Sequence, residues 1–206
     1  MEENKQTTEE QILEAAEKVF LNKGFKNSKI SEIAELAGVN NALINYYFRS
    51  KENLFNKVLY GKVEFLAKSI IYTVNQNLSF GEMVKDFIDA QFDFFRENEL
   101  LPRFIMSEVL SDESRSKMFR DNIVPIILNA GIQLNIRLQQ EINDGHVRNI
   151  SMFDLLYMIT SLNVLCFVIK PVITGTGEHP IATHFSEVMD DRKNKNVEIV
   201  MNYLKI

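Results

Sequence analysis

The sequence predicts an all-α protein of about nine helices, divided into a small N-terminal domain (residues 1–52) and a larger helical domain (residues 53–206). Three observations favour this class. Apolar residues recur at helical spacing along the chain, capping and stop residues separate these segments, and no stretch alternates with the period of a β-strand. With 206 residues, the chain is long enough to bury a sizeable core.

Four helices are expected in the first 76 residues, each preceded by a residue whose side chain can accept a backbone N–H at the helix start. These capping residues are Thr7 or Thr8, Ser28, Asn40 and Ser50. Gly24 ends the first helix and Gly38 the second, because glycine adopts the left-handed conformation at little cost. The fourth helix is expected to reach about residue 76.

Five further helices are expected over residues 80–97, 101–110, 114–143, 152–169 and 184–203. Pro102 falls in the first turn of its helix, where proline is tolerated. Pro125 lies inside the long segment, so it should kink or split that helix. Asp144 and Gly145 form its stop signal.

Residues 28–55 form the most informative stretch, because they predict two short helices, a tight turn at Gly38 and the start of a longer helix. This is the pattern of a helix-turn-helix, whose second helix enters the major groove of DNA. On that helix, we expect residues 41 and 45 to share one face and residues 44 and 48 to share the opposite one. An Asn side chain can pair with both N6 and N7 of adenine, which suits Asn41 and Asn45 to reading bases.

Other residues of the motif suit different contacts with DNA. Leu43 can meet a thymine methyl group, and the hydroxyls of Tyr46 and Tyr47 suit phosphate. Lys51 adds a positive charge beside the unpaired N–H groups at the start of the fourth helix, which predicts a phosphate site. The formal net charge of −5 does not oppose this interpretation, because affinity depends on the local field. The basic residues that surround the motif are Lys23, Lys26, Lys29, Arg49, Lys51, Lys57 and Lys62.

The first quarter of the chain resembles the DNA-binding domain of the TetR family of bacterial transcriptional regulators. The matching positions are Ile12, Leu13, Ala15, Ala16, Phe20, Lys23, Gly24, Phe25, Ser28, Ile33, Ala34, Ala37, Gly38, Val39, Tyr47, Phe48, Ser50, Lys51 and Glu52. The resemblance implies that Ile44 and Phe48 pack inward. The DNA-binding residues that we infer are Ser28, Lys29, Asn40, Asn41, Leu43, Asn45, Tyr46, Tyr47 and Lys51. Ala42, Leu43 and Asn45 depart from the family's usual residues, so the DNA sequence read should differ.

The region after residue 78 is rich in Phe and Met, a composition typical of a core. The resemblance implies that part of it forms a cavity for an apolar or amphipathic small molecule. The candidates for its lining are Phe92, Phe95, Phe104, Met106 and Met158. The runner-up interpretation keeps the DNA-binding domain but gives the larger domain a protein partner or no effector.

The last two helices are more apolar than one subunit's core requires, and a monomer would expose an unusually large apolar patch. We therefore expect a homodimer with a two-fold four-helix interface, as in the family. The interface residues that we predict are Leu155, Ile159, Leu162, Phe185, Val188, Met189 and Val200. The alternative is that both helices only cover the core of their own subunit.

Other classes of function have little support in the sequence. The histidines and Cys166 match no standard zinc spacing, so we expect no metal and no cofactor. Residues 152–173 contain Asp154, Asn163 and Lys170, which favour a buried helix over a membrane span. An enzyme built on a helical bundle is a further alternative, but no paired nucleophile and base appears in the sequence to support it. The sequence thus predicts a cytoplasmic homodimeric repressor that binds a near-palindromic operator and is released by a small ligand.

Overall fold

The computed structural model describes residues 7–74, 78–175 and 184–205, and within them every regular element is a helix. The elements are α1 (Thr8–Asn27), α2 (Ile30–Ala37), α3 (Asn41–Phe48), α4 (Lys51–Val74), α5 (Phe80–Glu97), α6 (Leu101–Phe104), the π-helix η1 (Ile105–Val109), α7 (Glu113–Asn122), α8 (Val124–Asn143), α9 (Met152–Val168), α10 (Lys170–Thr174) and α12 (Phe185–Leu204). The predicted all-α class is confirmed.

The described residues contain eleven α-helices where about nine were expected, and prolines account for the difference. Pro125 lies in the first turn of α8, so the long segment is split into α7 and α8 as predicted. Pro171 likewise lies in the first turn of α10 and separates this short helix from α9. The stop at Asp144 and Gly145 is also confirmed, since Asp144 caps α8 and Gly145 has a φ of 74°.

Three of the four predicted N-terminal caps are present. Thr7 Oγ1 accepts from the N–H of Glu10 at 3.3 Å, Asn40 Oδ1 from that of Leu43 at 2.9 Å, and Ser50 Oγ from that of Asn53 at 3.0 Å. The prediction for Ser28 is wrong, because Lys29 occupies the cap position of α2 and the hydroxyl of Ser28 donates to the carbonyl of Phe25 at 2.8 Å.

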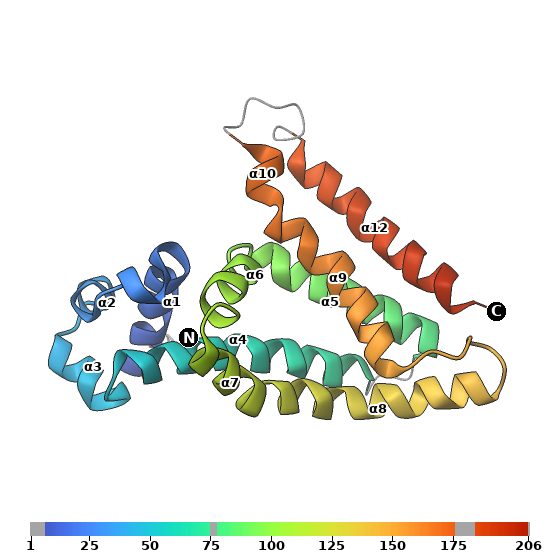
Figure 1. Cartoon of the computed structure of the whole chain (residues 1–206), viewed down its shortest axis with the longest axis horizontal. Coiled ribbons are helices and arrows are strands. Elements are labelled where there is room, and N and C mark those ends of the chain that lie inside the picture. Colours follow the sequence, from blue (N-terminus) through green and yellow to red (C-terminus); the bar gives the residue numbers. More distant parts are fainter. Residues whose placement is uncertain (1–6, 75–77, 176–183, 206) are drawn as a thin grey trace, which may run out of the picture.

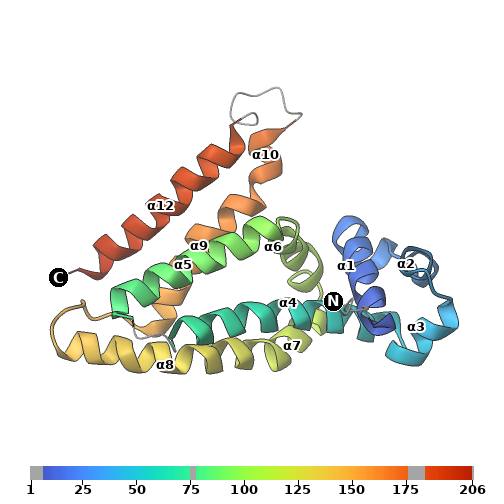
Figure 2. The same ribbon diagram turned by 180° about the vertical axis from the view of Figure 1, so that it is seen from behind.

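The helices form two parts that we call the head and the body. The head consists of α1, α2, α3 and the first turns of α4, and it projects from one end of the molecule (Figure 1). In the body, the rest of α4 lies along α8, α5 packs against α9, and α12 follows the outer edge of both α5 and α9. Figure 2 shows the same arrangement from behind, with α6, η1 and α7 at the junction with the head.

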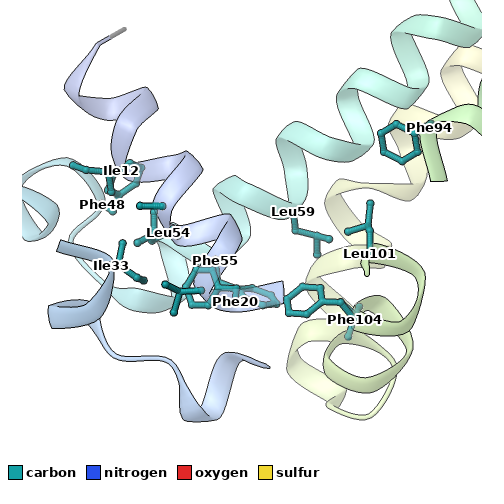
Figure 3. Packing of buried hydrophobic residues seen from close by; sticks show 14 of the residues in the cluster. Ile12, Phe20, Ile33, Phe48, Leu54, Phe55, Leu59, Phe94, Leu101 and Phe104 are labelled. Atoms are coloured by element: carbon teal, nitrogen blue, oxygen red, sulfur yellow. The ribbon is translucent and has the colours of Figure 1, made fainter. Parts of the chain in front are cut away.

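One hydrophobic core runs from the head into the body. Phe20 on α1 and Phe55 on α4 are fully buried with ring centroids 5.4 Å apart, and Phe104 on α6 lies 5.4 Å from Phe55 (Figure 3). A second cluster lies at the far end of the body, among α5, α8, α9 and α12. Because the ring of Phe104 on α6 packs against the core of the head, the two parts are joined by a packed interface and not by a loose linker.

Candidate DNA-binding surface and ligand cavity

Helix α3 has one face in the head's core and the other in solvent. Ile44 and Phe48 are buried, with 1% and 6% of their surface exposed. Asn41 and Asn45 are exposed on the flank beside these anchors and not on the opposite face as expected, because a turn of about 100° per residue places residues 41, 44, 45 and 48 within one arc. Tyr46 lies opposite the anchors and is 78% exposed. Two buried anchors thus fix the helix while its amides and a phenol point to solvent.

The remaining candidates, on α3 and at its cap, are partly buried or already make contacts within the protein. Leu43 is half-buried, and Tyr47 is 42% exposed with its ring 5.4 Å from that of Tyr46 in an edge-on arrangement. The side chain of Asn40 is exposed, but its oxygen already accepts the N–H of Leu43. Asn40 is therefore best able to offer DNA its side-chain N–H₂ group.

The turn between α2 and α3 sets the angle at which α3 is presented. Gly38 has φ 68° and ψ 28°, a left-handed conformation that a side chain would strain. Its N–H donates to the carbonyl of Glu35 at 3.1 Å, and the N–H of Val39 donates to that of Ala34 at 2.9 Å. These bonds close the end of α2, so the chain turns sharply into α3.

Ser28 and Lys51 lie together, and both face the protein. Ser28 is only 3% exposed and its hydroxyl is bonded to the carbonyl of Phe25, so its side chain is not available to DNA. Lys51 Nζ donates to the carbonyl of Ser28 at 2.6 Å and lies 4.5 Å from the centre of the Phe25 ring. Lys51 therefore braces α4 against the α1–α2 turn, in contrast to the exposed Lys29.

Arg49 is exposed in the turn after α3 and was absent from the candidates inferred from the sequence. Its φ of 64° is rare for a residue with a side chain, and the N–H of Ser50 donates across it to the carbonyl of Phe48 at 2.7 Å. This is a γ-turn, a tight and strained connection. The turn places a permanent positive charge at the C-terminal end of α3, a feature that sequence alone could show only as one more basic residue.

The body contains an apolar cavity of about 310 Å³. Its lining residues are Phe87, Gln91, Phe94, Phe95, Leu101, Pro102, Ile105, Met106, Leu110, Phe119, Ile127, Leu156, Thr160 and Val164. Two of the five predicted residues, Phe95 and Met106, are among them. Phe92 and Phe104 lie in the core instead, at 0% and 6% exposure, and Met158 borders a separate surface hollow near Tyr203.

A wider groove of about 580 Å³ separates α1 from α4 and α5. It is lined by charged side chains, namely Glu10, Glu14, Glu17, Glu97, Lys57 and Lys62, together with a few apolar residues. Because Lys62 already pairs with Glu17 at 2.8 Å, the groove is partly neutralised by the protein itself. Its open, charged walls fit an apolar effector less well than the enclosed cavity does.

Of the predicted interface residues, four belong to the core of their own subunit. Leu155, Ile159, Met189 and Val200 are between 0% and 5% exposed, so they are not available to a partner. Leu162 and Phe185 are half-buried, and Val188 is 43% exposed. The apolar residues that α9 and α12 do expose are Phe153, Tyr157, Leu165, Val188, Ile199 and Tyr203.

The part of the chain that the structure describes contains neither a candidate metal site nor a candidate membrane-spanning helix. No three His, Cys, Asp or Glu side chains there are grouped as a metal site requires, and His179 lies outside that part. None of the helices it contains is both long and apolar enough to pass through a membrane.

Comparison with known proteins places the head in a family. Residues 12–58 match the model of "Bacterial regulatory proteins, tetR family". The chain is 31% identical over 113 residues to the "Probable HTH-type transcriptional regulator YttP" of Bacillus subtilis, a stretch that covers 53% of this chain and 54% of that protein. It is 50% identical over 52 residues to the HTH-type transcriptional repressor NicS of Pseudomonas putida, covering 25% and 24% of the two chains. The sequence matches thus span about half of the first relative and a quarter of the second.

Solved structures extend the likeness of the fold to the whole chain. The regulator FadR of Bacillus subtilis, solved with stearoyl-CoA, superposes with a TM-score of 0.71 at 19% identity, over 94% of this chain and 98% of FadR. FadR of Bacillus halodurans gives 0.66 at 19% identity, over 93% and 97%. Residues 12–58 in the head thus match the tetR family of bacterial regulatory proteins, and the chain as a whole shares its fold with these solved structures.

Proposed function

We propose that this protein is a transcriptional repressor that binds a near-palindromic operator as a homodimer. The observation that carries the proposal is helix α3, whose buried anchors Ile44 and Phe48 leave Asn41, Asn45 and Tyr46 in solvent. Exposed amides on a helix held by a helix-turn-helix suit the edges of adenine in the major groove. Lys29 and Arg49, exposed at the two ends of the motif, suit the flanking phosphates.

The homodimer is proposed from the outer faces of α9 and α12. Phe153, Tyr157 and Leu165 are 73%, 68% and 57% exposed on α9, and Ile199 and Tyr203 add to the apolar surface on α12. Large apolar groups that gather on two adjacent helices mark an interaction surface in a protein of this size. A two-fold axis through this surface would pair the four helices and present two α3 helices to one duplex.

We further propose that a small ligand in the cavity of the body releases the operator. Helices α6 and η1 form one wall of the cavity, and the same segment contacts the head through Phe104 and Phe55. A ligand that shifts this wall would therefore change the spacing of the two heads. A 100-fold loss of operator affinity requires only about 2.7 kcal/mol of difference between the two states. The apolar cavity favours this scheme over a regulator without an effector.

Selection of bound fragments from random DNA tests the proposal directly. We expect enrichment of a near-palindrome whose half-sites lie about one helical turn apart or slightly more. The selected duplex should then bind one dimer in analytical ultracentrifugation. If the folded protein enriches no sequence, the result would contradict the DNA-binding function and favour an enzymatic or protein-binding role. Acting on chromosomal DNA also implies the cytoplasm as its location.

A further inference from the structure

The cavity of the body is lined by fourteen residues, of which only Gln91 and Thr160 carry polar side chains. No charged side chain of the described residues lines it. Its volume of about 310 Å³ lies at the small end of the range of about 300–1,000 Å³ for small-molecule pockets. An ion placed inside would lose its water without gaining a counter-charge, so the lining disfavours charged groups.

The two polar side chains stand at one end of a chain of buried amides. Asn196 on α12 donates to Asn163 Oδ1 at 2.9 Å, and Asn163 on α9 donates to Gln91 Oε1 at 3.1 Å. Gln91 Nε2 in turn donates to Thr160 Oγ1 at 3.2 Å. Asn163 and Asn196 are fully buried and Gln91 is 4% exposed, so the amides hold one another in a single orientation.

This orientation decides which hydrogen-bonding groups remain for a ligand. The oxygen of Gln91 is used by Asn163, whereas its nitrogen carries two hydrogens and one of them goes to Thr160. Within the described residues, the second hydrogen of that nitrogen and the hydroxyl hydrogen of Thr160 have no acceptor. The polar edge of the cavity therefore offers donors, and the matching group on a ligand is an acceptor oxygen.

We propose that the cavity binds an uncharged molecule with an apolar body and one acceptor oxygen, such as an ester or a ketone, held at Gln91 and Thr160. The proposal rests on the function proposed above, in which this cavity receives the effector. An uncharged ligand of this kind differs from fatty-acid anions, from cationic amphiphiles and from acyl carriers that bear phosphate groups. Gln91 is only 4% exposed, so its free N–H holds the oxygen of the ligand within the cavity, and Thr160 lies on the side of this contact that is nearer the rim.

Isothermal titration calorimetry on the full-length protein without DNA provides the test. The probes are methyl decanoate, decanoate and decylammonium, which share a hydrocarbon chain and differ in the charge of the polar end. We expect methyl decanoate to bind at least about 10-fold more tightly than either ion, because burying an unpaired charge is costly. Equal affinities for the ester and an ion, or no binding of the ester, would overturn the proposal.

Three variants locate the polar contact. Thr160→Val keeps the shape of the side chain and should weaken binding of the ester about 3- to 10-fold, as for the loss of one hydrogen bond. Thr160→Lys, at the exposed rim, should weaken ester binding and confer binding of decanoate. Ser161→Ala is the matched control, because this neighbouring hydroxyl on α9 donates to the carbonyl of Met158 and does not line the cavity. Equal effects of Thr160→Val and Ser161→Ala would overturn the assignment of Thr160.

Operator release is measured separately, so the two proposals can fail independently. If the ester binds with the expected preference but leaves operator binding unchanged, the inference on ligand chemistry stands and the effector role fails. If the protein binds its selected DNA but not the ester, the ligand inference fails while the DNA-binding function stands.

Discussion

The guanidinium of Arg115, on α7, lies 5.0 Å from the centre of the Phe25 ring in the head. Its Nε donates to the carbonyl of Glu108 at 2.6 Å, and its terminal nitrogen lies 3.3 Å from a carboxylate oxygen of Asp112. The same Phe25 ring is also contacted by Lys51, which belongs to α4. One aromatic ring thus joins a cation of the body to a cation of the head, next to the segment that walls the cavity.

Arg115→Met should destabilise the protein by about 3 kcal/mol in urea unfolding. Removing one partner of a buried ionic cluster typically costs about 3–5 kcal/mol, and the lower value applies because Asp112 stays partly solvated. Arg120→Met is the control on the same helix, since its side chain is 68% exposed. Equal losses of stability for the two variants would show that Arg115 contributes no more than a surface charge.

Lys29→Gln should weaken binding to all DNA sequences alike and reduce the dependence on salt. For each phosphate that a subunit no longer neutralises, the slope of log affinity against log salt should fall by about 0.9. Lys51→Gln is the informative comparison, because Lys51 is bonded to the carbonyl of Ser28. We expect Lys51→Gln to lower the stability of the head, with a slope change smaller than that of Lys29→Gln. The reverse order would assign the phosphate contact to Lys51.

Asn45→Ala should change base preference at one position of each half-site, at a cost of about 1–3 kcal/mol for removing a bidentate pair. The measurement is a selected sequence logo for the variant and for the unmodified protein. Asn22→Ala is a suitable control, because Asn22 is an exposed amide on α1, bonded to the carbonyl of Lys18. An unchanged logo for Asn45→Ala would remove this residue from direct readout.

Leu165→Glu should dissociate the proposed dimer, because it places a charge on the outer apolar face of α9. Leu128→Glu is matched to it, since Leu128 is 60% exposed against 57% for Leu165 but lies on α8. Sedimentation at micromolar concentration should give a species of about 24 kDa for the first variant and about twice that mass for the second. A dimer in both cases would move the interface away from α9, and dissociation by both would extend it to α8.

The sequence was sufficient for features that local chemistry decides. Thr7, Asn40 and Ser50 cap their helices because a short polar side chain reaches the nearest unpaired N–H, and Pro125 splits its helix because it has no N–H to donate. Helical spacing placed Ile44 and Phe48 on one face, and the resemblance to the family implied that this face is buried, as it is. Ser28 departed from this pattern because the competing acceptor, the carbonyl of Phe25, is provided by the kink at Gly24.

Features set by packing between distant elements could not be predicted from spacing alone. Helix α9 is apolar on most of its circumference, so no polar face distinguished the buried Leu155 and Ile159 from the exposed Tyr157 and Leu165. In the same way, a run of Phe residues did not reveal that Phe95 borders a cavity while Phe92, three residues earlier, lies in the core. Arg115 gave no signal, because a single Arg on a polar helix usually faces solvent.

The contacts of Phe20 with Phe55 and of Phe55 with Phe104 make residues 1–52 unsuitable for transfer to another protein as an isolated domain. A fragment cut at residue 52 would leave behind Phe55 and Phe104, and Phe20 would face water where it now faces rings. Loss of such packing typically costs about 3–5 kcal/mol per large aromatic residue. Chimeras that aim to redirect this protein to another operator should therefore exchange only the solvent-facing positions of α3. Whole-domain swaps would have to carry Phe104 and its helix with them.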